Sequence, residues 1–356
     1  PMFSYQKDVG VFVGAGAIYT RHGFRKHPWS SRHNLSAGYA TEAEKPRFRY
    51  EGRWQDKDPR FLWIADLYYS GIEVMRFYGF GNDTTEGGSD KRYRVRSTQL
   101  GAAPAIQFTF PDDRFTVSGG PWINWSDTKD GNRLIDDLDP YGNGSFAMVG
   151  AVATARFDSR RSLADVDTAL ILPFHDNPAA GYPTSGFLVD LVAEVSPPLW
   201  DVEHTWGAIE GTISGYLTPG EQRRLTLAAR VGGRQTFGTV PYLKAAYIGG
   251  SESFERTASV RGLRAQRFAG DASLYGNLDL RLFLIRAKLI VPTDVGLLGF
   301  GDVGRVFHDE NDSDNWHPSG GGGIWFAPLA RFNTVSLTVA ASEEETLFYM
   351  MTGFLF

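Results

Sequence analysis

Two acidic loops of this 356-residue chain contain residue types that could bind a cation. They are His308, Asp309, Glu310, Asp312, Asp314 and His317, and Asp127, Asp130, Asp136, Asp137 and Asp139. Neither loop has the glycine placement and the closing glutamate of a calcium-binding loop. Because acidic loops are usually solvated surface, we expect no metal site.

The sequence contains no residue pattern typical of catalysis. Gly-x-Ser-x-Gly, His-Glu-x-x-His and a phosphate-binding loop are all absent, and the seven histidines are scattered. The net charge of -5 also argues against nucleic acid as a partner, because nucleic acid requires a basic stripe. We therefore expect neither an enzyme nor a nucleic-acid-binding protein, and we expect no cofactor.

Charged residues stand in an unusual setting between Tyr247 and Phe283. A glycine-bearing loop carries Arg261 and leads into a strand that starts at Ala272. One face of this strand holds Leu274, Leu278, Leu280, Leu282 and Leu284, and the other holds Tyr275, Asn277, Asp279, Arg281 and Phe283. In a membrane barrel the apolar face contacts lipid and the polar face lines a wet lumen. The alternation therefore predicts a transmembrane strand.

The rest of the chain repeats this kind of segment. Roughly 15 or 16 stretches, most of ~10 residues, alternate in polarity, and ~10 residues is the length of a membrane strand. Glycine contributes 41 residues, aromatics 14%, and cysteine none. We predict one all-β domain, an antiparallel transmembrane β-barrel of about 16 strands over residues 9–356, with a long loop folded into its lumen and an N-terminal lead-in at 1–8. The segment Ser159–Thr184, with an apolar stretch at Ala169–Phe174, could not be oriented.

Two arginine runs lie opposite apolar residues. Arg47, Arg49 and Arg53 alternate with Phe48, Tyr50 and Trp54, and Arg92, Arg94 and Arg96 alternate with Tyr93 and Val95. On a soluble sandwich these arginines would form a solvated face. In a barrel they would line the lumen, which is the arrangement we predict.

Four motifs resemble the BamA/TamA family, the bacterial surface-antigen barrels of the outer membrane that insert or export other proteins. Gly249-Gly250 followed by Val260-Arg261-Gly262-Leu263 is similar to the tip of the family's sixth extracellular loop, with Leu263 replacing the usual aromatic. Phe300-Gly301-Asp302-Val303-Gly304 is similar to its Phe-x-Asp-x-Gly strand motif, and Asp279-Leu280-Arg281 stands where the family often has Glu-x-Arg. The resemblance is strongest over residues 185–356.

The fourth motif is the C-terminal Gly353-Phe354-Leu355-Phe356, which resembles the family's terminal insertion signal through Phe354 and Phe356. The resemblance also implies an internal contact, in which Arg261 on the lumen loop pairs with Asp302 in a charge-assisted bond. Asp279 and Arg281 are a second candidate partner. Gly262 would let the backbone turn at the loop tip, and Gly301 and Gly304 would leave room for the loop.

A barrel must also close between its first and last strands, expected at Val9–Tyr19 and Thr346–Phe356. In the resembled family this seam can open laterally, so that a client strand pairs with an exposed edge. Gly10, Gly14, Gly16 and Gly353 would weaken or kink the pairing at the seam. Alternatively, these glycines accommodate bulky neighbours.

The resemblance implies a barrel of the bacterial outer membrane that inserts or assembles outer-membrane proteins without nucleotide or metal. Its expected partners are unfolded outer-membrane protein clients, outer-membrane lipids and lipopolysaccharide, and periplasmic accessory domains or lipoproteins. Two alternatives stay open. One is a barrel that translocates or anchors an N-terminal patatin-like or metallophosphatase-like domain outside this chain, and the other is a porin-like channel.

Overall fold

A computed structural model of the chain describes residues 2–6, 10–24, 26–129, 131, 133–162, 182–220, 224–250, 258–288, 290–309 and 313–356. Within these residues seventeen strands form one antiparallel sheet, and sixteen of them pair in chain order; the two-residue β9 (Arg161–Ser162) pairs with β10, beside the pairing of β8 with β10. That leaves sixteen strands in one meander, so the predicted all-β barrel fold is confirmed. None of the helices described is long and apolar enough to cross a membrane.

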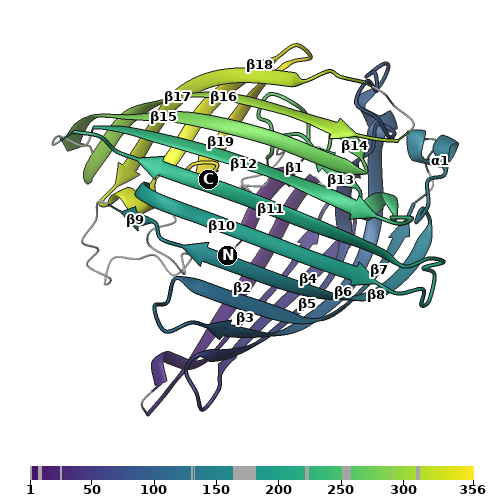
Figure 1. The fold of residues 1–356 in the computed structure, drawn as a ribbon, viewed down its shortest axis with the longest axis horizontal. Coiled ribbons are helices and arrows are strands. Elements are labelled where there is room, and N and C mark those ends of the chain that lie inside the picture. Colours follow the sequence, from purple (N-terminus) through teal and green to yellow (C-terminus); the bar gives the residue numbers. More distant parts are fainter. Residues whose placement is uncertain are drawn as a thin grey trace.

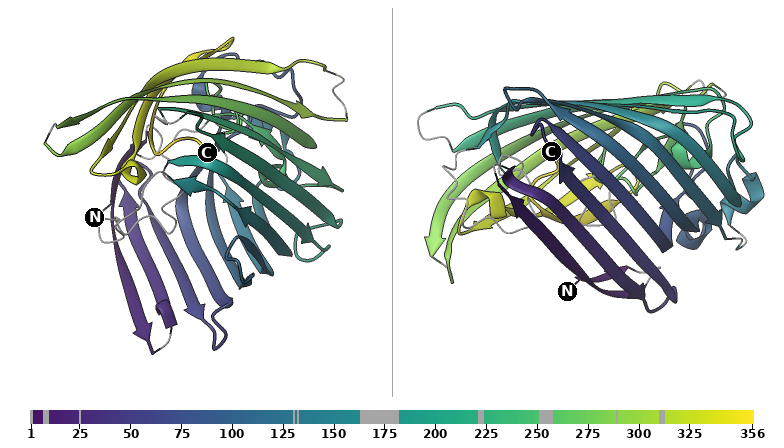
Figure 2. Two further views of the ribbon diagram at one scale, coloured as in Figure 1. Left: turned by 60° about the vertical axis from the view of Figure 1, so that its left-hand side comes forward. Right: turned by 90° about the horizontal axis from the view of Figure 1, so that it is seen from below.

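The sixteen strands of the meander have the following bounds. They are β1 (Met2–Gln6), β2 (Gly10–Gly23), β3 (Lys26–Ala40), β4 (Lys45–Gln55), β5 (Phe61–Arg76), β6 (Arg94–Thr109), β7 (Phe115–Thr128), β8 (Ser145–Asp158), β10 (Pro183–Ser196), β11 (Trp206–Leu217), β12 (Leu225–Phe237), β15 (Ala272–Lys288), β16 (Pro292–Phe307), β17 (His317–Pro328), β18 (Val335–Ser342) and β19 (Thr346–Thr352). Figure 1 shows them tilted side by side, and Figure 2 shows the sheet curling round on itself.

Side-chain alternation gives the sheet an apolar outer face and a polar inner face. On β15, Leu274, Leu278 and Leu280 are exposed, whereas Asp279 and Arg281 are fully buried. This is the arrangement predicted for a barrel strand, because exposed leucines are stable against lipid. The arginines of β4 alternate with exposed Phe48 and therefore lie on the inner face, as predicted.

The connections differ in length between the two ends of the sheet. Antiparallel pairing places alternate connections at the same end. One end has long loops, among them residues 77–93, 129–144 and 308–316, with the helix α1 (Leu134–Leu138) and the 3-10 helix η1 (Asp90–Tyr93). The opposite end has short turns such as residues 56–60 and 110–114, apart from the longer connection 159–182 between β8 and β10. In outer-membrane barrels the long loops are extracellular.

The longest loop, residues 238–271, lies between β12 and β15 at the long-loop end; we refer to it as the lumen loop. It contains the 3-10 helix η4 (Tyr242–Lys244) and a two-stranded ladder of β13 (Ala246–Ile248) and β14 (Phe268–Gly270). Residues 251–257 of this loop, and the apolar stretch Ala169–Phe174, lie outside the described residues. A third 3-10 helix, η5 (Arg331–Asn333), lies in the turn after β17.

Two predictions about the ends of the sheet are corrected by the structure. Residues 1–8, expected as a lead-in, include β1, which pairs with β2 from Met2 opposite Gly14 to Gln6 opposite Gly10. At the other end β19 stops at Thr352, and Gly353 takes a positive φ of 85° that turns the chain out of the strand. The end strands are therefore β1 and β19, not Val9–Tyr19 and Thr346–Phe356.

Candidate functional site

Arg261 at the tip of the lumen loop is fully buried and binds two carboxylates on the barrel wall. Its Nε and Nη2 donate to the two oxygens of Asp302 on β16, each at 2.7 Å, and its backbone N–H donates to the same carboxylate at 2.9 Å. Nη2 also donates to Asp279 on β15 at 2.8 Å, and the guanidinium lies 3.7 Å from the centroid of the Phe300 ring. The guanidinium pairs with two carboxylates, and its contact with Asp302 is bidentate. These contacts compensate for the desolvation of the buried guanidinium.

Arg281 extends the same network toward the C-terminal residues. It donates to Asp279 at 2.9 Å and to the backbone oxygen of Phe356 at 2.8 Å, and its guanidinium lies 4.1 Å from the centroid of the Phe354 ring. Asp279 therefore bridges two arginines. The structure brings together the residues predicted for the loop contact and those predicted for the terminal signal, because the chain after Gly353 folds inward against Arg281.

The rest of the loop tip is held by close packing. Val260 and Leu263 are buried in one cluster with Ile248, Phe268 and Val306. A Cβ at Gly304 would lie 2.7 Å from Val260 Cγ2, so glycine at this position makes room for the loop. Gly301 faces away from the loop, and a Cβ there would meet nothing closer than 3.9 Å. The expectation that Gly301 leaves room for the loop is therefore wrong, because Gly301 has the opposite strand parity to Asp302 and Gly304.

The loop tip also contacts the last two strands of the sheet. Gly262 donates its backbone N–H to Tyr349 Oη on β19 at 2.9 Å. Its carbonyl accepts from Ser342 Oγ at the end of β18 at 2.7 Å. The φ of Gly262 is +87°, a conformation that glycine adopts at no steric cost. These contacts join the lumen loop to one of the two end strands.

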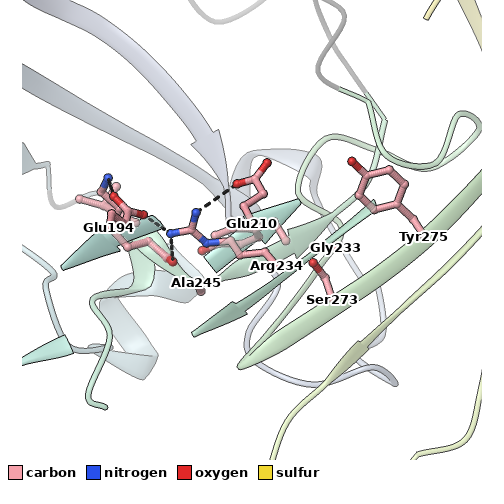
Figure 3. A pocket seen from close by; sticks show the side chains of 10 residues that line it. Glu194, Glu210, Gly233, Arg234, Ala245, Ser273 and Tyr275 are labelled. Carbon is pink, nitrogen blue, oxygen red and sulfur yellow. Dashed lines mark hydrogen bonds and ion pairs between the residues drawn. The ribbon is translucent and has the colours of Figure 1, made fainter. Parts of the chain in front are cut away.

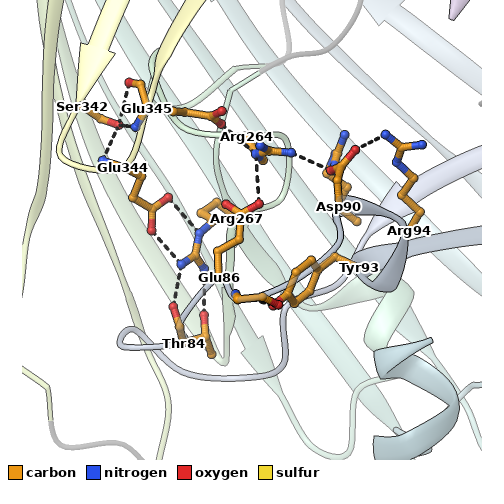
Figure 4. A network of polar contacts seen from close by, with 12 residues as sticks. Thr84, Glu86, Asp90, Tyr93, Arg94, Arg264, Arg267, Ser342, Glu344 and Glu345 are labelled. Atoms are coloured by element: carbon orange, nitrogen blue, oxygen red, sulfur yellow. Dashed lines mark hydrogen bonds and ion pairs between the residues drawn. The ribbon is translucent and has the colours of Figure 1, made fainter. Parts of the chain in front are cut away.

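Two further arginines of the lumen loop bind the β18–β19 turn and the loop 77–93, in a cluster that we term the clasp (Figure 4). Arg264 contacts Glu345 at 2.9 Å, Glu86 at 3.2 Å and Asp90 at 2.5 Å. Arg267 contacts Glu344 at 2.6 Å and donates to the carbonyl of Thr84 at 2.6 Å. The clasp therefore connects three segments that are far apart in the sequence.

No sequence pattern indicates the clasp. Its residues are ordinary charged residues in loops, and only the folded chain shows that they meet. Asp90 is its most heavily paired acid, since Arg76, Arg94 and Arg264 all contact it. Burial raises the pKa of Asp90, but the hydrogen bond from Arg76 and the nearby positive charges lower it further, so the net pKa lies below the ordinary value.

Arg230 on β12 is another residue of the site that carries no sequence signal. Its Nη2 donates to the carbonyl of Ala258 at 2.7 Å, and its Nε donates to Asn277 at 2.8 Å. Asn277 in turn donates to the carbonyl of Ser259 at 2.8 Å. Arg230 and Asn277, two buried residues of the barrel wall, thus donate hydrogen bonds to backbone carbonyls just before the loop tip. These hydrogen bonds hold the backbone that positions Arg261.

A second polar cluster fixes the first part of the lumen loop to the wall (Figure 3). Lys244 contacts Glu194 on β10 at 2.9 Å, and its ammonium lies 4.7 Å from the centroid of the Trp122 ring. Arg234 on β12 contacts Glu194 and Glu210, the latter at 3.1 Å. Because Lys244 of the loop pairs with Glu194 of the wall, which Arg234 also contacts, this cluster is an anchor for the loop.

The glycines predicted at the seam lie in different places. Gly10, Gly14 and Gly16 are on β2, which is the second strand of the sheet. A Cβ at Gly14 would lie 2.6 Å from the carbonyl oxygen of Ala37 on β3, which fits the alternative that glycine accommodates close neighbours. Gly353 ends β19 and donates its N–H to the carbonyl of Thr334 at 2.6 Å.

Several side chains of the acidic loops contact protein groups. His308 contacts Asp271 at 2.8 Å, and His317 Nε2 lies 3.0 Å from the carbonyl oxygen of Asn82. Asp136 accepts from the backbone N–H groups of residues 131 and 133. Asp130, Glu310 and Asp312 lie outside the described residues. Within the described part of the chain, no group of three or more potential ligands could hold a metal ion.

Solved structures with the same fold cover nearly the whole chain. A structure of BamA from Haemophilus ducreyi lacking POTRA domains 1-3 aligns with a TM-score of 0.63 at 13% identity, over 97% of this chain and 68% of that chain. CdiB from Escherichia coli aligns with a TM-score of 0.60 at 12% identity, over 97% of this chain and 60% of that chain. CdiB from Acinetobacter baumannii aligns with a TM-score of 0.54 at 11% identity, over 98% and 57%.

This chain therefore spans less than two thirds of the CdiB structures and about two thirds of the BamA structure. No family model matches the chain, and no curated protein matches it. At these identities the likeness shows the fold. The chain has the β-barrel fold of BamA and CdiB, as the resemblance of its motifs implied.

Proposed function

We propose that this chain is a barrel of the bacterial outer membrane that inserts or assembles other outer-membrane proteins through the seam between β1 and β19. The likeness to BamA supports this proposal through the fold. Unfolded outer-membrane proteins are then its clients, and outer-membrane lipids are its surroundings. Periplasmic accessory domains or lipoproteins would assist it from the short-turn end.

The observation that carries the proposal is the contact between the lumen loop and the last strand. Gly262 binds Tyr349 on β19, and the clasp binds Glu344 and Glu345 in the turn that precedes this strand. The end strand β19 is therefore held by contacts with the lumen loop, in addition to the hydrogen bonds that pair it with β18. Such a strand can be held or released without loss of the rest of the barrel, which a lateral seam requires.

The buried loop tip argues against the porin-like alternative. Val260, Arg261 and Leu263 are buried within the barrel, where a porin would have a water-filled path. A porin should show steady ion conductance in planar bilayers, and that conductance should not depend on Arg261. Among the described residues, no contact favours the other alternative, a barrel that translocates or anchors an N-terminal enzyme domain.

The proposal is tested by a disulfide that locks the seam, measured by insertion of an unfolded outer-membrane protein into liposomes. The chain contains no cysteine, so an engineered pair forms the only disulfide. One cysteine is placed along Met2–Gln6 and one along Thr346–Thr352, and the pair that oxidises most completely is used. We expect oxidation to reduce client insertion at least ~10-fold and dithiothreitol to restore it.

The matched control is a cysteine pair within the last hairpin at Val339 and Phe348, which are partners across β18 and β19 and are both exposed. This pair introduces the same chemistry without crossing the seam, so insertion should be unchanged. If the locked seam inserts clients as fast as the control, the seam is not the working part. Retained activity of a linked enzyme domain in the locked barrel would then favour the anchoring function.

A further inference from the structure

A cationic cleft lies between the loops 77–93 and 129–144 at the long-loop end, next to the clasp. It has a volume of about 570 Å³ and is lined by Gly87, Gly88, Ser89, Lys91, Arg92, Arg94, Arg96, Gly131, Arg133 and Asp137. Five of these side chains are cationic and one is acidic. Arg94 is engaged with Asp90 of the clasp. The cleft therefore carries an excess of positive charge at the surface of a chain whose net charge is -5.

The strand β6 places this cleft directly beyond the apolar outer surface of the barrel. Arg94 and Arg96 have the same strand parity as Leu100 and Ile106, which are 49% and 41% exposed. Successive even positions of a strand share one face, and the pairing of β6 with β7 is in register from Ser97 onward, although β5 shifts register opposite Thr98. The prediction that these arginines line the lumen is wrong, because Val95 packs inward against Phe77 and Tyr242.

Position and charge together identify the ligand chemistry. On this face of β6 the side chains change from exposed and apolar to the partly buried Arg96 and the buried Arg94 toward the long-loop end, as a protein does where acyl chains give way to head groups. Guanidinium groups bind phosphate oxygens with paired, charge-assisted hydrogen bonds, and a lysine adds a point charge. The exposed pair between Arg92 and Asp137, at 3.1 Å, contributes little to stability and can yield to a stronger anion.

We propose that this cleft binds the phosphate groups on the head group of an outer-leaflet lipid of the lipopolysaccharide class. Lys91, Arg92 and Arg96 contact the phosphates, and Ser89 and the glycines of the loop 77–93 allow the head group to approach the backbone. This inference rests on the proposed outer-membrane location of the barrel. It does not depend on client insertion or on the seam.

Binding is measured with the detergent-purified, folded chain titrated with rough-form lipopolysaccharide in micelles. The same lipid after enzymatic dephosphorylation and inorganic phosphate are the two comparison ligands. We expect the dephosphorylated lipid to bind at least ~10-fold more weakly, and affinity for the intact lipid to fall as salt rises. Inorganic phosphate that binds as tightly as the lipid would overturn the assignment to a lipid head group.

The test variant carries Lys91→Gln, Arg92→Gln and Arg96→Gln, and leaves Arg94 in place because it holds Asp90. The control carries Lys57→Gln, Arg21→Gln and Arg114→Gln, which remove the same residue types at the short-turn end. We expect the test variant to lose at least ~10-fold in affinity and the control to stay within ~2-fold. Equal affinities for the two variants, with both folded by gel mobility, would overturn the proposal.

Client insertion into vesicles without the phosphorylated lipid separates this inference from the proposed function. The test variant should insert clients there at the wild-type rate, because it retains Arg94, the cleft residue that pairs with Asp90 of the clasp. A failure of lipid binding with normal insertion contradicts only the cleft. A failure of insertion by the wild-type chain contradicts only the proposed function.

Discussion

Gly262 of the lumen loop donates its backbone N–H to the hydroxyl of Tyr349 on β19, at 2.9 Å and out of contact with solvent. This bond joins a segment that fills the lumen to an end strand of the sheet. Any displacement of β19 toward an open seam must therefore break the bond or move the loop with the strand. The loop and the strand form one mechanical unit in this conformation.

Replacing Tyr349 with Phe removes the acceptor and leaves the Gly262 N–H buried without a partner. Such a loss costs about 1–3 kcal/mol, so the midpoint of thermal unfolding in detergent should fall. Tyr39→Phe is the control, because Tyr39 is 49% exposed on the outer face. An unchanged midpoint for Tyr349→Phe would show that the loop does not depend on this bond.

Gly304→Ala should destabilise the barrel because the added Cβ would collide with Val260, 2.7 Å away. Overpacking of this kind costs about 1–3 kcal/mol. The same substitution in a Val260→Ala background should cost much less, since the colliding atoms are gone. Gly301→Ala on the same strand should be neutral, because its Cβ would have no neighbour closer than 3.9 Å. Equal losses at Gly301 and Gly304 in thermal unfolding would contradict this packing.

Acid should weaken the clasp through Asp90. Because the folded-state pKa of this carboxyl is depressed below its ordinary value of 3.8, its stabilising contribution is complete above that value and is lost as pH falls below it. Proteolysis at Lys91 after incubation between pH 7 and pH 3 should therefore increase at the acidic end. Asp90→Asn should be cleaved readily at all pH values. Equal pH profiles for the two proteins would contradict this assignment.

Deleting Phe356 should lower stability, because Arg281 loses the backbone oxygen that accepts its hydrogen bond at 2.8 Å. It should also slow insertion of the chain itself if this residue is part of the insertion signal. The two effects are separated by following the heat-modifiable gel band in time and by unfolding the inserted product. Unchanged insertion kinetics would remove the signal role and leave the packing role.

Much of the fold could be predicted from strand periodicity. The leucines of β15 alternate with buried Asp279 and Arg281, and this regular pattern fixes both the strand and its orientation. The strand β1 was missed because it has only five residues, although Phe3 and Tyr5 alternate with Ser4 and Gln6. The inward turn at Gly353 has no sequence signal. Phe354 and Phe356 keep the alternating pattern of a strand, whether the chain continues along β19 or turns inward.

The candidate site was only partly predictable. The resemblance of two motifs singled out Arg261 and Asp302, which the structure places in contact. Arg230, Arg264 and Arg267 carry no local sequence signal, since their partners lie in segments up to 183 residues away. Arg94 and Arg96 were assigned to the lumen because Tyr93 and Val95 resemble a lipid-facing pair. The lumen loop packs against Val95, so Val95 faces inward and the arginines do not. Periodicity alone cannot show such packing.

The most direct test of the contact between the lumen loop and the barrel wall is a double-mutant cycle on Arg261 and Asp302, measured by thermal unfolding in detergent. Asp279 stays in place in all four proteins, so the cycle isolates the bidentate contact. Removing one partner of a buried pair typically costs about 3–5 kcal/mol, and the structure predicts a coupling energy well above ~1 kcal/mol. Additive single losses would contradict the account, because they would place Arg261 out of contact with Asp302.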